Sequence, residues 1–237
     1  MLRKCFLIAG FDDKIYGGER GTGGYCLKKI RIAREGIPYV AFFLLLAVAF
    51  YLWKPSWSGL PLGLALFSAF FFRNPDRHIP DQPGVVVSPA DGVILDISET
   101  FEPEYIKDKA LRVSIFLSLF NVHINRIPVD GEVEYISRVS GKFVPAFHRD
   151  ASRLNSRNLV GMRTEWGKLL VVQITGYVAR RIVCHARIGE RYRTGDVFGL
   201  IKFGSCTEVY LPLDVELCVR VGEKVRGGES IIGRFAT

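Results

Sequence analysis

"GLIKFGSCTEVYLP", residues 199–212, is a run of β-forming residues that a Gly-Ser pair breaks near its middle. Branched and aromatic side chains favour strands on both sides of the pair. Gly204 permits a bulge or a strained turn, and Ser205 carries a hydroxyl that can act as a nucleophile. A hydrolase nucleophile elbow is not predicted, because Thr207 stands where G-x-S-x-G requires its second glycine. Local composition alone therefore favours a β-bulge.

Similar short segments fill the rest of the C-terminal part. Runs of four to eight residues rich in Val, Ile, Leu and Tyr alternate with Gly, Pro and Asp, as in "GVILDIS", "LRVSIFLS", "GEVEYIS", "KLLVVQITG" and "DVELCVRVG". This spacing is typical of an all-β sandwich or barrel. We expect a mainly β domain over residues 80–237, in which only 103–110 and 148–158 are helical or irregular.

Two of these segments are similar to the hairpins of biotinyl/lipoyl-type hybrid barrels. They are "SPADGVILDI" at 88–97 and "VGEKVRGGESIIGRF" at 221–235. Their glycines permit tight turns, and their Val and Ile side chains supply a core. A carrier domain would also present a modifiable Lys at a hairpin tip. Lys202 lies instead in a strand-like run, so lipoyl-like elements are predicted without a carrier function.

The region before the β domain predicts a membrane anchor. Residues 37–53 and 58–72 carry no charge, and at about 1.5 Å per residue the first run nearly crosses a hydrocarbon core of about 30 Å. Trp53 and Trp57 flank the connecting turn, as aromatic residues do at membrane interfaces. The flanks are basic, with Lys28, Lys29, Arg31 and Arg34 before the runs and Arg73 and Arg77 after them. We predict a hydrophobic helical hairpin over 31–79 with both ends on the cytoplasmic face.

Two other interpretations of the N-terminal region are weaker. Buried core helices would show a polar face, which these runs lack. Residues 1–30 contain the Gly-rich stretch "GGERGTGGY", and their apolar stretch "FLIAG" is too short for a signal peptide. We expect a flexible leader there.

Composition indicates the partners. The chain has 237 residues and a formal net charge of +8, which favours an anionic partner. With the hairpin, that partner is expected to be an acidic membrane surface and not a nucleic acid. The five cysteines are an odd number without metal-binding spacing, so a reducing compartment and no metal are expected.

Three residue types of a nucleophilic triad occur in distinctive settings. Asp91 lies in the turn "SPADG", His123 follows an apolar run in "FNVHINRIP", and Ser205 follows Gly204. A histidine in such a run is by default a satisfied core residue. The other histidines, at 78, 148 and 185, have weaker contexts.

The ordered set "FFRNPDR", "SPADG", "FNVHINRIP", "ARRIV" and "GLIKFGS…VYLP" resembles the short, prokaryotic form of phosphatidylserine decarboxylase. The resemblance runs from about residue 33 to the C-terminus. It implies a proenzyme that cuts itself between Gly204 and Ser205 into a large chain, 1–204, and a small chain, 205–237. Ser205 would become a covalent pyruvoyl group, the electron sink for decarboxylation.

The resemblance also implies roles for the other site residues. His123 would take the Ser205 hydroxyl proton, and Asp91 would orient the imidazole. Longer forms carry a second His three positions before the one that matches His123, where this chain has Phe120; His148 is a candidate substitute. Arg180 and Arg181 are candidate contacts of the lipid phosphate, or else ordinary solvated strand ends.

The expected activity is that of a carboxy-lyase of phospholipid biosynthesis at the cell membrane, converting phosphatidylserine to phosphatidylethanolamine. Three alternatives remain at this point. The substrate could be the ether lipid archaetidylserine. The protein could be a membrane-anchored lipoyl-like binding module without chemistry. It could also be a serine hydrolase, which would leave an intact chain with a reactive Ser205.

Overall fold

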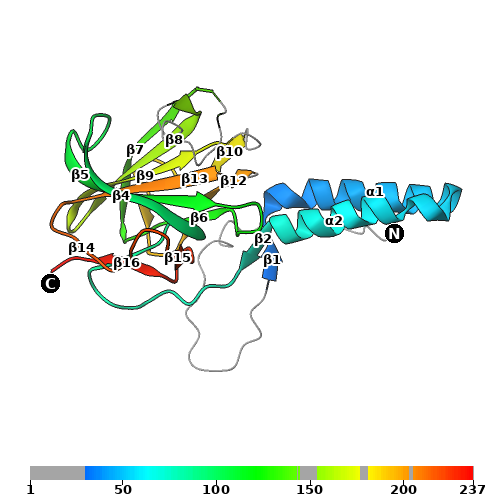
Figure 1. Cartoon of the computed structure of the whole chain (residues 1–237), viewed down its shortest axis with the longest axis horizontal. Coiled ribbons are helices and arrows are strands. Elements are labelled where there is room, and N and C mark those ends of the chain that lie inside the picture. The colour runs from blue at the N-terminus through cyan, green and yellow to red at the C-terminus, as the bar shows by residue number, and fades with distance from the viewer. Residues whose placement is uncertain (1–29, 143, 145–153, 177–180, 203–204, 237) are drawn as a thin grey trace, which may run out of the picture.

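The protein is described here from a computed structural model, which places residues 30–142, 144, 154–176, 181–202 and 205–236. The architecture is mainly β, as predicted, with a helical hairpin that projects from the β domain (Figure 1). Except for Ile30, the predicted leader lies outside the described residues.

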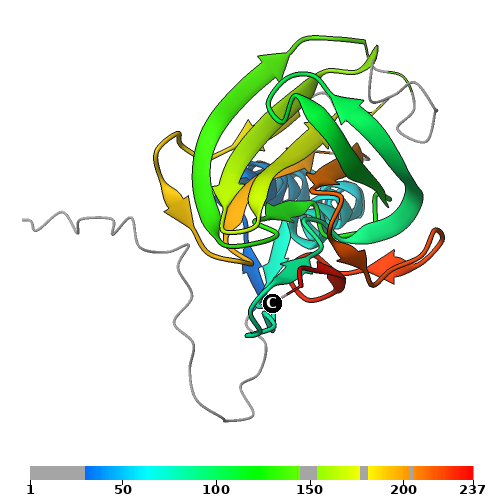
Figure 2. The same cartoon turned by 90° about the vertical axis from the view of Figure 1, so that its left-hand side faces the viewer.

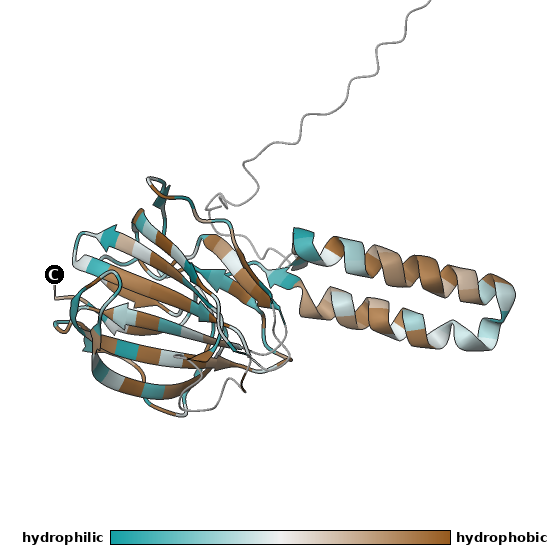
Figure 3. Ribbon diagram, turned by 90° about the horizontal axis from the view of Figure 1, so that it is seen from above, coloured by the Kyte–Doolittle hydropathy of each residue, from teal (hydrophilic) through white to brown (hydrophobic). Residues whose placement is uncertain are grey.

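The two uncharged runs form helices α1 (Ile37–Trp53) and α2 (Gly59–Phe71), joined by a 3₁₀ turn (Pro55–Trp57). They pack against each other, and Figure 3 shows that their surfaces are largely apolar. Strands β1 (Ile30–Ile32) and β2 (Arg73–Pro75) pair antiparallel at the base of the hairpin. The two ends of the hairpin are therefore joined where they meet the β domain.

An eight-stranded sheet curls into an open half-barrel, which Figure 2 shows nearly end-on. Its order is β11 (Arg191–Tyr192), β7 (Gly131–Val139), β8 (Arg157–Thr164), β9 (Gly167–Ile174), β13 (Ser205–Leu211), β5 (Asp108–Leu117), β4 (Gly92–Glu102) and β15 (Lys224–Val225). The main core fills the concave side and includes Ile115, Leu117, Met162, Phe198 and Leu211.

Two three-stranded sheets complete the β domain. One has the order β10 (Arg181–Cys184), β12 (Val197–Lys202), β6 (Ile124–Arg126), and the other β14 (Glu216–Leu217), β16 (Ile231–Arg234), β3 (Val85–Val87). The resemblance of 88–97 and 221–235 to lipoyl-type hairpins stays a prediction.

Two details of the sequence-based assignment are wrong. Residues 108–110, expected as helical or irregular, begin strand β5. Residues 157–158 begin β8, which local composition did not indicate.

The base of the hairpin packs on the β domain through a small apolar cluster. Phe71 and Phe72 from the end of α2 contact Val122, Ile124 and Leu200 of the β12–β6 region. Burying two phenylalanine side chains contributes roughly 3–6 kcal/mol. The orientation of the hairpin is thus tied to the strand that follows His123.

Candidate active site

The break at the Gly-Ser pair marks a change of sheet. Strand β12 ends at Lys202 in a three-stranded sheet, and β13 begins at Ser205 in the eight-stranded sheet. The change of sheet therefore falls between Lys202 and Ser205. Gly204 itself lies outside the described residues, so the predicted bulge or strained turn stays a prediction.

Ser205 is held rigidly and is buried. It pairs with Leu117 of β5 at the start of a strand that lies between β5 and β9. Its exposed fraction is 0%, and its Oγ has no hydrogen-bond partner among the residues that the structure describes. An unpaired buried hydroxyl costs about 1–3 kcal/mol, which is a usual mark of a functional group.

A short turn places His123 at the same junction. Ser118 follows Leu117, the partner of Ser205, and its backbone N–H and Oγ both donate to Asn121 Oδ1, at 2.9 and 2.6 Å. The chain then enters β6, and the His123 carbonyl accepts a hydrogen bond from the Ile201 N–H at 3.1 Å. His123 thus lies against the end of β12, close in the fold to the start of β13.

The surroundings of His123 favour the neutral imidazole that carries its proton on Nδ1 and its basic lone pair on Nε2. Nδ1 lies 3.0 Å from the Asn121 carbonyl oxygen, which can only accept, so Nδ1 carries the proton. Burial lowers the pKa of His123 to about 4; the Asn121 hydrogen bond opposes this shift and the charge of Arg73 adds to it. The ring also packs on Phe71, with centroids 4.2 Å apart.

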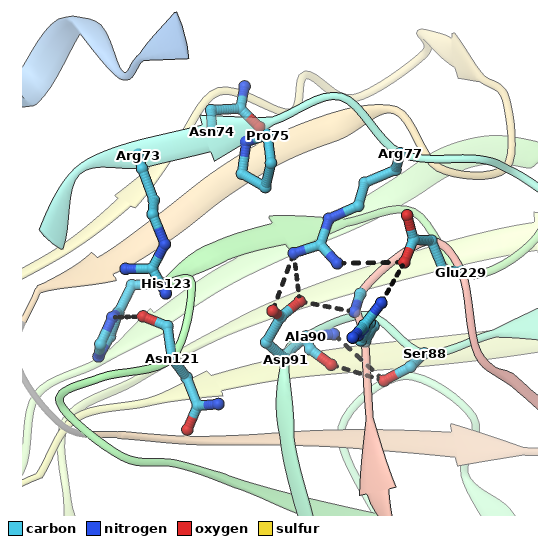
Figure 4. A network of polar contacts seen from close by, with 12 residues as sticks. Arg73, Asn74, Pro75, Arg77, Ser88, Ala90, Asp91, Asn121, His123 and Glu229 are labelled. Atoms are coloured by element: carbon cyan, nitrogen blue, oxygen red, sulfur yellow. Dashed lines mark hydrogen bonds and ion pairs between the residues drawn. The ribbon is translucent and has the colours of Figure 1, made fainter. Parts of the chain in front are cut away.

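Asp91 has other partners than those expected. Arg77 donates from Nη2 to both carboxylate oxygens of Asp91, at 2.9 and 2.8 Å, and the Gly227 N–H donates to Oδ1 at 2.8 Å (Figure 4). Within the described part of the chain, no hydrogen bond joins Asp91 to His123. The role of Asp91 as the residue that orients His123 stays a prediction, and in this structure the Asn121 carbonyl binds Nδ1 instead.

Of the remaining predicted residues, the structure describes Arg181 and Phe120. Arg181 is exposed and is the first residue of β10. In the register of the sheet it lies opposite Lys202 of β12. Arg180 and His148 lie outside the described residues. Phe120 is 71% exposed, and its carbonyl accepts a hydrogen bond from Arg73.

Sequence reasoning missed the arginines of "FFRNPDR" as site residues. Arg73 and Arg77 both point toward the site in Figure 4, Arg73 toward His123 and Arg77 toward Asp91. The signal was present, because the motif places two cations directly after an apolar run. Among the described residues no group of three or more His, Cys, Asp or Glu side chains could hold a metal ion.

Comparison with known proteins shows the family of the chain. The sequence profile of the family "Phosphatidylserine decarboxylase" matches residues 64–233. The chain is 51% identical over 181 residues to a phosphatidylserine decarboxylase proenzyme of Carboxydothermus hydrogenoformans, covering 76% of this chain and 85% of the relative. It is 48% identical over 205 residues to the proenzyme of that name from Symbiobacterium thermophilum, covering 86% and 95%. On this match over most of both chains, the protein belongs to the phosphatidylserine decarboxylase family.

Proposed function

We propose that the protein decarboxylates phosphatidylserine to phosphatidylethanolamine, after cutting itself between Gly204 and Ser205. The observation that carries the proposal is the buried, unpaired Ser205 Oγ at the junction where the neutral His123 also lies. The names of the relatives, which are proenzymes, support the same activity.

The self-cleavage follows from the groups at the junction. Ser205 Oγ attacks the Gly204 carbonyl carbon while His123 Nε2 takes the hydroxyl proton, and the peptide C–N bond breaks as an ester forms. Removal of the Ser205 α-proton then expels the Gly204 carboxylate and leaves dehydroalanine. Water converts dehydroalanine to a pyruvoyl group and releases ammonia. Asp91 is the proposed positioning residue for His123.

The residues present fit a pyruvoyl group at position 205. The backbone of β13 is hydrogen-bonded on both sides, by β5 and β9, so a new N-terminus at 205 would stay in place. The pyruvoyl carbonyls would accept the electron pair of the C–C bond that breaks when CO2 leaves. His123 Nε2 would pass to the product a proton that it first takes from the substrate ammonium group.

The small chain would remain bound to the large chain after cleavage. Strand β13 is internal to the eight-stranded sheet. The Arg77 guanidinium also lies 3.5 Å from Glu229, and the Gly227 N–H donates to Asp91. These contacts join residues 205–237 to the part before the cut.

The hairpin supports a membrane location for the enzyme. Arg34–Trp53 is long and apolar enough to cross a membrane, and only 11% of its most apolar window is buried. In contrast, α2 has 13 residues, or about 20 Å, and is too short to cross alone. Leu45, Leu52, Trp53 and Leu60 are each more than 70% exposed, as expected for side chains that face lipid. We propose that residues 31–79 anchor the catalytic domain, 80–237, to the cytoplasmic face.

Topology can be tested with protease. When protease is added to spheroplasts, residues 80–237 should stay intact, because the basic flanks of the hairpin retain both of its ends in the cytoplasm. Inverted vesicles should show the opposite result and serve as the control. Digestion of 80–237 in intact spheroplasts would reverse the assignment.

Mass spectrometry and a lipid assay test the proposed function together. Purified protein should show two species, one ending at Gly204 and one beginning at 205 that is one ammonia lighter than a peptide with an N-terminal serine. The same sample should release CO2 from phosphatidylserine. A single intact chain without activity would favour a binding module, and turnover only of archaetidylserine would change the substrate. A serine hydrolase would be labelled at Ser205 by a fluorophosphonate, which the complete burial of Ser205 disfavours.

A further inference from the structure

Arg73 is a cation at the point where the hairpin meets the candidate active site. It is the first residue of β2, two positions after the end of α2. Its Nη1 donates to the Phe70 carbonyl at 2.8 Å and its Nη2 to the Phe120 carbonyl at 2.7 Å. The guanidinium carbon also lies 3.9 Å from the centroid of the Phe70 ring. These contacts hold the side chain in one place.

The guanidinium of Arg73 retains donors and charge for a ligand. A guanidinium carries five N–H donors, and the two carbonyls use two of them. No carboxylate among the described residues lies within ion-pair distance of Arg73. Its neighbour Arg77 differs, because Asp91 and Glu229 both pair with it. Within the described part of the chain, no adjacent carboxylate therefore neutralises the charge of Arg73.

The electrostatic surroundings also favour an anion at Arg73. Burial lowers the pKa of this arginine, the more distant Asp91 raises it, and the charge of Arg77 lowers it. A half-buried cation with another cation nearby is stabilised when an anion approaches.

The position of Arg73 matches the level of a lipid headgroup. The apolar hairpin ends at Phe71, whose ring packs on His123, and Arg73 follows two residues later. Figure 4 shows the Arg73 side chain directed toward His123. A lipid whose acyl chains lie along the hairpin would thus bring its headgroup to Arg73 before the reacting carbon reaches the Ser205 junction.

We propose that Arg73 binds the phosphodiester of the phospholipid substrate. This inference rests on the proposed function. Phosphatidylserine offers two anions, the phosphodiester and the carboxylate. A cation on the carboxylate would stabilise the substrate more than the transition state, in which that carboxylate is losing its charge, and would slow the reaction. The phosphodiester keeps its charge throughout, so binding it does not oppose the chemistry.

The proposal predicts a specific kinetic pattern for Arg73→Leu. Substrate, transition state and product all carry the phosphodiester. Loss of its contact with Arg73 should therefore weaken the binding of all three equally. With monomeric dihexanoyl phosphatidylserine, KM should rise about 10- to 100-fold, as for a lost charge-assisted hydrogen bond, while kcat changes little. The dissociation constant of dihexanoyl phosphatidylethanolamine, measured by calorimetry, should rise by the same factor.

Matched variants separate binding from structure. Arg73→Lys keeps the charge but loses the planar fork, so it should show an intermediate KM. Arg191→Leu removes an exposed arginine of β11 and should change neither constant. Normal cleavage at 204–205 in each variant would show that the fold is intact. If Arg73→Leu does not mature, Arg73→Lys provides the test.

Several outcomes would overturn the proposal. One is unchanged binding of the phosphatidylethanolamine in a matured Arg73 variant. A second is a fall in the kcat of Arg73→Leu at constant KM. A third is that Arg181→Leu, and not Arg73→Leu, raises the KM for phosphatidylserine and the dissociation constant of phosphatidylethanolamine. A wild-type protein that binds the short-chain lipid through Arg73 but releases no CO2 would refute the proposed function alone. Wild-type protein that binds no short-chain phospholipid, or binds inorganic phosphate equally well, would refute a lipid site at Arg73.

Discussion

Ser205→Ala is expected to leave a single chain of 237 residues that has no decarboxylase activity. Alanine removes the only atom at position 205 that can attack the Gly204 carbonyl, so neither the cut nor the pyruvoyl group can form. The fold should survive, because Oγ makes no hydrogen bond to the described residues and its loss breaks none of their contacts. Intact-mass analysis and release of CO2 from phosphatidylserine measure the two effects.

Ser205→Cys is the matched control for this prediction. A thiol at this position is still a nucleophile, so cleavage should continue. It should be slow, because position 205 is completely buried and burial disfavours the thiolate. Cleavage of Ser205→Ala at the normal site, or activity of an uncut wild-type chain, would disprove the pyruvoyl mechanism.

His123→Ala is expected to slow self-cleavage about 10²- to 10⁴-fold, the usual contribution of a general base, and to accumulate the full-length proenzyme. The physical reason is that Nδ1 is protonated toward the Asn121 carbonyl, which leaves the Nε2 lone pair as the base. Pulse-chase labelling followed on a denaturing gel measures the rate. Normal maturation of this variant would remove His123 from the cleavage reaction.

The pH dependence of wild-type cleavage provides a second measurement of the same role. The active form is the neutral imidazole, and burial lowers the pKa of His123 to about 4. The base is therefore already present at neutral pH, and cleavage should be nearly independent of pH from about 6 to 8. The rate should fall only as the pH drops toward 4. A fall with a midpoint near 6.5 would show that the histidine is not held in this environment.

Variants of Asp91 distinguish its two possible roles. If Asp91 orients His123 during cleavage, Asp91→Asn should accumulate the proenzyme. Arg77→Leu, which keeps the Asp91 carboxylate, should mature much faster than Asp91→Asn. If instead the Arg77–Asp91 ion pair acts only by stabilising the fold around Gly227 and Glu229, the two variants should mature equally slowly, because each breaks the same pair. Normal maturation of both would leave Asp91 as a turn residue.

Secondary structure could be predicted well where it depends on local composition. The hairpin was evident because each run is uncharged over its length, and the strands around Ser205 were evident from their branched side chains. Strand β8 begins two residues earlier than expected, and this start was missed because Asn158 is a poor strand former. It exists because β7 and β9 pair with it on both sides. Gly161 is required there for a tertiary reason, since a Cβ would lie 2.6 Å from the Tyr105 ring.

The sequence by itself determined the apolar helical hairpin and the β class, and it singled out Ser205 as the candidate nucleophile, because the period of apolar residues and the motifs around Gly204-Ser205 are local. Only the tertiary structure decided which groups surround that nucleophile. Pairing of β13 with β5 and of β12 with β6 brings His123 to the junction, and the path of residues 73–77 brings Arg77 to Asp91. These contacts join residues that are far apart in the chain, such as Arg77 and Asp91, 14 positions apart, and Ser205 and Leu117, 205 − 117 = 88 positions apart. Their geometry depends on strand register and core packing, which no single segment encodes.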